Sequence, residues 1–370
     1  MNSYKKVAIL FSKFENFHWE KDPGYISRKL QNIGHEVSVF STLYFTSPVD
    51  QKINTLTFSK EDYFSGTFLR KEEFERLIIY HFDFRYIPLL KIAKELNMKV
   101  IIKADHNGYL PMLESDTIRK NIYYNAKKLV KSILNIAYKA QFLEFINLVD
   151  NVIIESYVGY RRFVAMFPIC ASKFVVIPNG YDFPDYVKYE KKNTIVAIGR
   201  WDDYKQKRVE RLLKAFLTAN DAIKVKYTLH LIGPCPMKIQ NKYKNENIFF
   251  MNKQPKNIIE KELKLSKILL MSSEWEGFPN VIVEAFGFNN TLVSTPFAAA
   301  SDSVLGGQCG LISEDYTSKD LASALIAEVM LWENNYRFQK EIYNLTSKYF
   351  NWSTVVQNIN NLITREKYEN

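Results

Sequence analysis

The sequence predicts an α/β protein of two domains, each built around a parallel sheet. The chain has 370 residues, which is too many for one ordinary core and suits two domains. Short apolar strands alternate with helical segments in both halves, as in βαβ units. The segment Tyr181 to Asn193 is charged and aromatic, and is typical of an interdomain linker. We therefore expect domains at 1–182 and 193–345, with a C-terminal segment at 346–370.

The N-terminal half opens with a strand, a helix and a second strand. We expect the strands at Lys6 to Phe11 and His35 to Phe40, and the helix at Tyr25 to Ile33. Gly24 lies at the junction of the loop and the helix, where free N–H groups could hold an anion. A dinucleotide-binding fingerprint needs three glycines, and Gly24 is alone.

A polar run follows the predicted strand Val100 to Ile102. It reads Lys-Ala-Asp-His-Asn-Gly and includes Asp105 and His106. Open α/β sheets bind ligands just beyond the carboxyl ends of their strands, so both residues are candidate site residues. The alternative is an Asx-type turn with a surface histidine.

The region 118–146 is a long helical segment with a strong positive bias. No acid occurs between Asp116 and Glu144, and apolar residues are interleaved with the cations. This pattern favours a basic amphipathic helix lying on an anionic membrane. The alternative is a solvated basic face on a helix that packs against its own domain. No recognised nucleic-acid motif accompanies the charge, so we expect no nucleic-acid partner.

Composition narrows the class of protein further. The net charge of +10 indicates an anionic partner, such as a phosphorylated ligand or a membrane face. The sequence has no run of 18 apolar residues and no cleavage-site pattern at its start, so we expect neither a spanning helix nor a signal peptide. Its three cysteines are far apart and suit a reducing compartment. We expect a cytoplasmic protein that can bind peripherally to the inner face of the membrane.

Two carboxylates stand eight positions apart in the second half, at Glu276 and Glu284. Between them, Gly277, Phe278 and Pro279 predict a tight turn, with Pro279 in the first helical position, and a short apolar helix from Asn280. A carboxylate among apolar residues is costly unless it is paired. No Lys, Arg or His occurs between residues 268 and 318. These acids therefore face a partner from another segment, or they accept hydrogen bonds from a ligand such as a sugar or ribose.

Cations precede this pair in the same predicted sheet. Gly199 and Arg200 end one strand, and Lys205 and Lys207 precede the helix that starts at Val209. Cations of this kind can hold a pyrophosphate, while the carboxylates can hold ribose and sugar hydroxyls. A sugar nucleotide has these parts in this order. Asp202 and Asp203 could suggest a metal-binding pair, but we interpret them as a loop and expect no metal.

These motifs resemble the retaining family 4 glycosyltransferases of the GT-B fold. The resemblance lies in Arg200 and Lys207, in the stretch E-G-F-P-N-V-I-V-E from Glu276 to Glu284, and in V-I-P-N-G-Y-D before the linker. It is strongest from Ile195 to Gly310. It implies two Rossmann-like domains with parallel sheets facing across a cleft, the donor held mainly by the second domain, and a C-terminal helix that returns to the first.

The resemblance also implies roles for individual residues. Arg200 and Lys207, or Lys205 in its place, would bind the donor pyrophosphate. Glu276 would contact the hydroxyls of the donor sugar, and Glu284 would hold the ribose. The remaining implied donor-side residues are Gly24, Gly199, Gly277, Phe278, Pro279 and Asn280, and Asp105 or His106 would lie near the transferred sugar.

The implied reaction is metal-independent transfer of a hexose from a nucleotide-diphosphate sugar, with retention at the anomeric carbon and no further cofactor. The acceptor would be a glycan or a lipid-linked glycan in surface polysaccharide biosynthesis. Two alternatives stay open at the level of the sequence. One is a sugar-nucleotide epimerase on the same scaffold, and the other is an inactive relative that docks on membranes through the basic helix.

Overall fold

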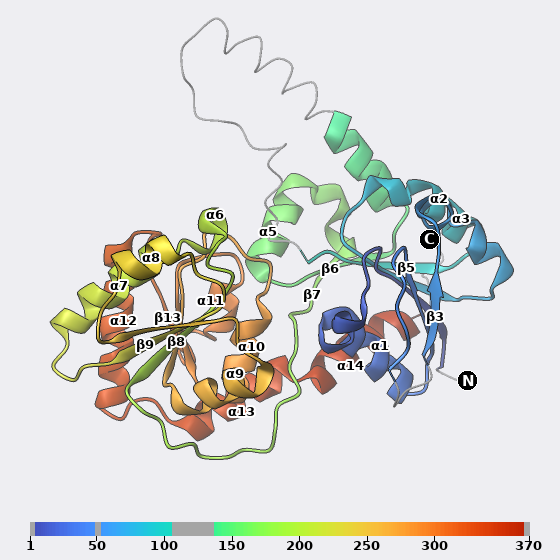
Figure 1. Ribbon diagram of the computed structural model, residues 1–370. Coiled ribbons are helices and arrows are strands. Elements are labelled where there is room, and N and C mark those ends of the chain that lie inside the picture. The colour runs from blue at the N-terminus through green and yellow to red at the C-terminus, as the bar shows by residue number, and fades with distance from the viewer. Residues whose placement is uncertain (1–3, 49–52, 106–136, 366–370) are drawn as a thin grey trace, which may run out of the picture. The chain divides into compact units, whose positions relative to one another are not determined.

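The computed structural model describes residues 4–48, 53–105 and 137–365. The chain forms two compact units (Figure 1), and each is described here by itself. The first unit contains residues 1–155, 159–177 and 356–370, and the second contains residues 156–158 and 178–355. The C-terminal segment therefore groups with the N-terminal one, although most of the chain separates them.

The first unit is built on a parallel sheet whose strand order is β3-β2-β1-β4-β5-β6-β7. The order reverses direction between β1 and β4, because the chain first adds strands on one side of β1 and then on the other. The strands are β1 (Lys6–Leu10), β2 (Glu36–Ser41), β3 (Asn54–Thr57), β4 (Arg76–Tyr80), β5 (Lys99–Lys103), β6 (Asn151–Ile154) and β7 (Phe174–Val176).

Helices cover this sheet, and one of them comes from the end of the chain. The α-helices are α1 (Asp22–Asn32), α2 (Lys60–Ser65), α3 (Ile87–Glu95), α5 (Tyr157–Met166) and α14 (Trp352–Thr364), with 3₁₀ turns η1 (Asn16–Glu20), η2 (Thr67–Lys71), η3 (Phe84–Tyr86) and η4 (Pro168–Lys173). The end of α14 is tied to the first unit, because Arg76 Nε donates to the Ile363 carbonyl at 2.5 Å. His35 Nε2 lies 2.8 Å from Asn360 Oδ1.

The second unit has a parallel sheet with the order β10-β9-β8-β11-β12-β13. This is the strand order of a doubly wound dinucleotide-binding fold. The strands are β8 (Thr194–Ile198), β9 (Thr228–Ile232), β10 (Ile248–Asn252), β11 (Ile268–Met271), β12 (Thr291–Ser294) and β13 (Gly310–Ile312). The helices are α6 (Tyr204–Lys207), α7 (Val209–Ala222), α8 (Met237–Lys242), α9 (Lys256–Leu265), α10 (Asn280–Gly287), α11 (Ala300–Ser303), α12 (Ser318–Glu333) and α13 (Gln339–Phe350).

Two apolar cores lie on the two faces of the second sheet (Figure 1). One contains buried side chains of α7, α8 and α12, including Phe216 and Leu325. The other contains those of α9, α10 and α13, including Phe286 and Phe350. Because β8, β9, β11 and β12 contribute buried side chains to both cores, these strands are largely apolar, as in other buried parallel sheets.

Three local predictions differ from the structure. Pro279 is the N-cap of α10 with φ −67° and ψ 125°, so the helix begins at Asn280 and not at the proline. The segment after Asp203 forms the short helix α6, because the Asp203 carboxylate accepts a hydrogen bond from the Gln206 N–H and caps it. Gly24 lies inside the first turn of α1, which begins at Asp22 and not after the glycine.

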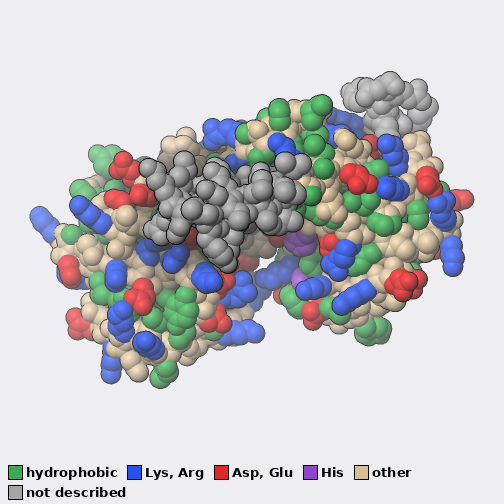
Figure 2. Space-filling model, turned by 90° about the horizontal axis from the view of Figure 1, so that it is seen from above, with side chains coloured by type: hydrophobic (Ala, Val, Ile, Leu, Met, Phe, Trp, Pro, Cys, Tyr) green, Lys and Arg blue, Asp and Glu red, His purple; other side chains and the backbone are tan. Residues whose placement is uncertain are grey.

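The basic segment 118–146 falls largely outside the described residues. Residues 137–147 are described and form a helix, whose apolar side chains Phe142, Phe145 and Ile146 are buried in the first unit's core. At this end, the apolar face packs against its own domain. Among the described residues, no helix is both long and apolar enough to cross a membrane. On the face shown in Figure 2, Lys and Arg are spread over both units with Asp and Glu among them.

Candidate donor site

The candidate site of the second unit lies where β8 and β11 end. These neighbouring strands belong to opposite halves of the sheet, so the point between them is the switch point of the fold, where open α/β sheets bind ligands. Gly199 and Arg200 directly follow β8, and the segment that contains Glu276 follows β11. The topology therefore brings the predicted cations and the first predicted carboxylate to one edge.

Lys207 and Glu276 form an ion pair at this edge. The Lys207 ammonium lies 2.5 Å from Glu276 Oε1, and the two side chains are 14% and 10% exposed. Ser273 Oγ donates to the same oxygen at 2.7 Å, and Gln206 Nε2 donates to Oε2 at 3.1 Å. The partner that the sequence required from another segment is thus Lys207. A buried ion pair with additional hydrogen bonds fixes both groups in one geometry.

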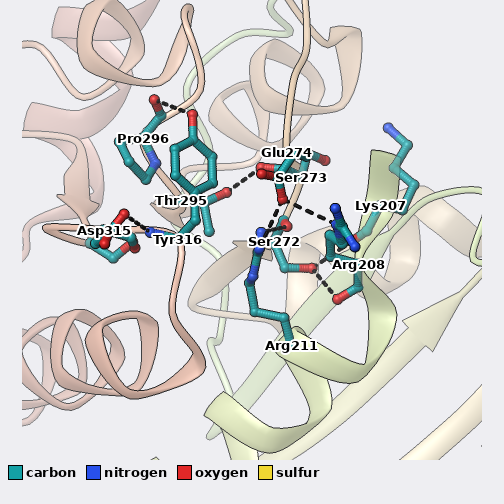
Figure 3. Close-up of polar contacts among 11 residues, drawn as sticks. Lys207, Arg208, Arg211, Ser272, Ser273, Glu274, Thr295, Pro296, Asp315 and Tyr316 are labelled. Carbon is teal, nitrogen blue, oxygen red and sulfur yellow. Dashed lines mark hydrogen bonds and ion pairs between the residues drawn. The ribbon is translucent and has the colours of Figure 1, made fainter. Parts of the chain in front are cut away.

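A bend between α6 and α7 directs Lys207. Arg208 has φ 50° and ψ 48°, a left-handed conformation that is uncommon for a residue with a long side chain. The bend is held from β11, because Ser272 Oγ lies 2.7 Å from the Lys207 carbonyl and 3.2 Å from that of Arg208 (Figure 3). The strand end therefore determines where the lysine points.

Glu274 secures the same bend on its other side. Its Oε2 lies 3.1 Å from Arg208 Nε and 2.8 Å from Arg211 Nη2 (Figure 3). Its backbone N–H donates to the Gln206 carbonyl at 2.7 Å. Glu276 thus pairs with Lys207 at the end of α6, and Glu274 pairs with Arg208 and Arg211 around the start of α7.

The start of α10 is fixed by an asparagine from the segment that precedes the linker. Asn179 is buried, and its Nδ2 donates to the Phe278 carbonyl at 2.9 Å and to Asn280 Oδ1 at 3.1 Å. The ring of Phe278 is 3% exposed and packs in the core, so this residue faces the site only through its backbone. Gly277 and Pro279 are half-buried in the turn before the helix.

Arg200 has a different environment from Lys207. Its side chain is 73% exposed, and its guanidinium lies 4.0 Å from the Asp203 carboxylate. Lys205 is also exposed, on α6. Gly199 is in close contact with the end of β9, because a Cβ on Gly233 would lie 1.8 Å from the Gly199 oxygen. Arg200 is therefore an exposed cation at the strand end, whereas Lys207 is buried in an ion pair.

Glu284 lies within α10 and is half-buried. It occupies the helix that starts beside Glu276, so both predicted carboxylates belong to elements at the same edge of the sheet. The cation that pairs with Glu276 is Lys207, the last residue of α6.

The first unit carries a buried charge cluster where β5 and β6 end. The Lys103 ammonium lies 2.8 Å from Glu155 Oε1 and 3.1 Å from Asp22 Oδ2, and its side chain is 1% exposed. Burial raises the pKa of Asp22 to about 6, against the lowering effect of Lys103. Burial alone would lower the pKa of Lys103, but the charges of Asp22 and Glu155 outweigh it and raise the pKa.

One predicted residue of the first unit, Asp105, belongs to this edge. Asp105 is exposed with a left-handed φ of 45°, and its N–H donates to Glu155 Oε1 at 2.8 Å. His106 lies outside the described residues. Gly24 is buried, and a Cβ there would lie 2.3 Å from Trp19 Cα, so close packing of α1 on η1 already requires a glycine.

Sequence reasoning missed the residues that hold the predicted ones. Gln206, Ser272, Ser273, Glu274 and Asn179 all contact the site elements. Ser272 and Ser273 directly follow a buried strand, and this position could have marked them. Nothing in the sequence pairs Glu274 with Arg208 and Arg211, which lie more than 60 positions away.

Residues 192–329 match the family model described as glycosyl transferases group 1. An uncharacterized glycosyltransferase of Methanocaldococcus jannaschii is 24% identical over 277 residues, which cover 72% of this chain and 68% of that protein. The solved structure of the lipopolysaccharide outer core galactosyltransferase WaaB has a TM-score of 0.70 and 16% identity, covering 97% of this chain and 99% of that one. The Anabaena protein HepE in complex with UDP-glucose has a TM-score of 0.68 and 14% identity, covering 98% and 100%.

At these sequence identities, the similarity to the solved structures shows the fold alone. Both units have the parallel doubly wound sheet that the sequence predicts, and each similar structure covers nearly the whole chain. The prediction of a GT-B fold is therefore confirmed. The chain has the GT-B fold of glycosyltransferases, and its second unit contains a segment that matches the glycosyl transferases group 1 family.

Proposed function

We propose that this protein is a retaining glycosyltransferase of family 4, which transfers a sugar from a nucleotide-diphosphate sugar to a glycan or lipid-linked acceptor in surface polysaccharide biosynthesis. The observation that carries the proposal is the ion pair between Lys207 and Glu276 at the switch point of the second unit. The segment that holds it matches a glycosyltransferase family, and whole-chain structural neighbours include a galactosyltransferase of lipopolysaccharide synthesis.

The pair provides an ammonium group for the diphosphate of a sugar nucleotide and a carboxylate for its sugar hydroxyls. On donor binding, the Lys207 ammonium would exchange the Glu276 carboxylate for a diphosphate oxygen. Glu276 would then be free to accept hydrogen bonds from the sugar hydroxyls, while Gln206 and Ser273 keep it in place. The exposed Arg200 would close on the diphosphate from the end of β8. Glu284 would hold the ribose from α10.

The chemistry follows from the charges at this edge. Departure of the nucleotide puts negative charge on its diphosphate, which Lys207 and Arg200 would stabilise. The acceptor hydroxyl would attack from the same face, and the leaving phosphate oxygen would take its proton. Retention at the anomeric carbon follows, and no protein base or metal is required. Catalysis is then positioning and electrostatic stabilisation.

The acceptor is proposed to approach from the first unit, where Asp105 and the adjoining His106 follow β5. A lipid-linked acceptor would place the enzyme on the inner face of the cytoplasmic membrane, with the basic segment 118–146 as the contact. Cosedimentation with vesicles that contain about one third anionic lipid tests this part. Equal recovery of the protein with neutral vesicles would contradict an electrostatic contact.

The experiment that tests the function is a thermal-shift panel of UDP, GDP and ADP sugars, followed by product analysis with the sugar that binds. We begin with uridine, because HepE is similar to this chain and was solved with UDP-glucose. A ligand at 100 times its dissociation constant stabilises the folded state by about 2.7 kcal/mol. The anomeric configuration of the product, read by proton NMR, tests retention. No shift with any sugar nucleotide would refute the proposal.

A further inference from the structure

A second basic site lies beside the donor site, on the face of the sheet covered by α7 and α12. A cavity of about 400 Å³ opens there, within the range of small-molecule sites. It is lined by Tyr204, Arg208, Val209, Glu210, Arg211, Lys214 and Ser318. Neither Lys207 nor Glu276 contributes to its lining, so the cavity is separate from the proposed donor contacts.

The charges around this cavity do not balance. Arg208, Arg211 and Lys214 contribute three cations, and one carboxylate, that of Glu274, serves both arginines. The only acid in the lining is Glu210, and Lys242 lies 2.7 Å from its carboxylate. Two positive charges therefore remain unbalanced.

The cavity has hydrogen-bond donors that are available for an anion. Arg208 uses Nε for Glu274, and no described residue accepts a hydrogen bond from its two terminal amino groups. Lys214 is exposed and has no ion pair within the described chain. Tyr204, which is 45% exposed, adds a hydroxyl at the rim.

Two helices begin at the same cavity. The first residue of α7, Val209, and the first residue of α12, Ser318, both line it. The remaining N–H groups and positive dipole ends of the two helices add to the field of the cations, while the acids in their first turns, Glu210 and Asp320, offset part of it. The left-handed conformation of Arg208 places a long cationic side chain where a glycine would be relaxed. This conformation is held by the contacts of Ser272 and Glu274 with Arg208.

We propose that this cavity binds a phosphomonoester, as a ligand distinct from the sugar donor. A phosphomonoester carries nearly two negative charges at neutral pH, which matches the imbalance, and its oxygens suit the forked guanidinium donors. A single carboxylate would match less well, because Glu274 already provides one. Its volume of about 400 Å³ exceeds that of a phosphate group, so a small organic group would fit as well.

The test is calorimetric titration of the full chain with inorganic phosphate and with glucose 6-phosphate, at constant ionic strength, with glucose as the neutral control. We expect both phosphates to bind the wild type and glucose not to bind. Lys214→Glu should weaken both phosphates by at least about tenfold, because a hydrogen bond to a charged group is lost and a repulsion is gained. Lys238→Glu, the same change at an exposed lysine of α8 outside the cavity, should leave the affinity unchanged.

A second pair of variants separates this site from the donor site. Lys207→Met should keep phosphate binding, because Lys207 does not line the cavity, while Lys214→Glu should keep sugar transfer. The inference is overturned if the wild type binds no phosphate at millimolar concentration, if Lys214→Glu binds like the wild type, or if Lys207→Met abolishes binding. The first two results leave sugar-nucleotide binding untouched, and the third would place phosphate at the donor site, so failure here and failure of the proposed function are distinguishable.

Discussion

The ion pair between Lys207 and Glu276 makes two separable predictions, one for stability and one for rate. In Lys207→Met, the Glu276 carboxylate keeps the hydrogen bonds from Gln206 and Ser273 but loses its cation while only 10% exposed. Removing one partner of a buried pair costs about 3 kcal/mol or more. For a unit of this size we expect the midpoint of thermal unfolding to fall by roughly 6–12 °C.

The double variant Lys207→Met with Glu276→Gln tests the coupling. It removes both charges, so its loss of stability should be smaller than the sum of the single losses by about 1–3 kcal/mol. The midpoints are measured by circular dichroism on matched preparations. Arg200→Ala serves as a control, since its 73% exposed side chain should contribute little to stability.

Sugar transfer should behave differently from stability. Lys207→Met should lose about two to three orders of magnitude in kcat, because it removes a contact to the charge that develops on the diphosphate in the transition state. Glu276→Gln should also lower kcat, because a neutral amide accepts weaker hydrogen bonds from the sugar hydroxyls. The double variant should regain part of the lost free energy of unfolding, while its kcat should stay as low as that of Lys207→Met. If it transfers sugar at close to the wild-type rate, the pair is only structural and our assignment of the donor site fails. Single variants with wild-type kcat would lead to the same conclusion.

Three further predictions follow from the structure. Burial raises the pKa of Asp22 to about 6 in the folded state, above its unfolded value, so the folded state binds more protons. The free energy of unfolding should therefore fall as the pH rises from about 4 to 6, by on the order of 3 kcal/mol. Asp22→Asn should flatten this slope in urea titrations, and an unchanged slope would exclude Asp22 as its source. Asn179→Ala should cost about 1–3 kcal/mol and raise the KM for the donor, because the Phe278 carbonyl loses its donor at the start of α10; a wild-type KM would count against this role. Sugar transfer should persist in excess EDTA if Arg200 and Lys207 neutralise the diphosphate, and a loss that magnesium restores would contradict the metal-independent mechanism.

The sequence by itself was sufficient for the class of fold and for bringing Lys207 and Glu276 forward as candidate site residues. Buried parallel strands are continuous apolar runs, and their spacing with helices between them predicts two doubly wound units. The segment from Glu276 to Glu284 combines a turn, a helix start and acids without a local cation, so it requires a distant partner whatever the details of the fold. These are properties of neighbouring residues, which is why the sequence reveals them.

The identity of that partner was decided only by the tertiary structure. Lys207 meets Glu276 because β8 and β11 lie side by side, and Ser272 and Glu274 then hold the bend at Arg208 that directs the lysine. The short helix α6 was missed because its stability comes from a cap and from these contacts, and not from a helical pattern of apolar residues. The cavity beside α7 and α12 is likewise invisible in the sequence. It exists because two helix starts that are far apart in the chain converge at one edge of the sheet, where Arg208 and Arg211 at the start of α7 share the Glu274 carboxylate.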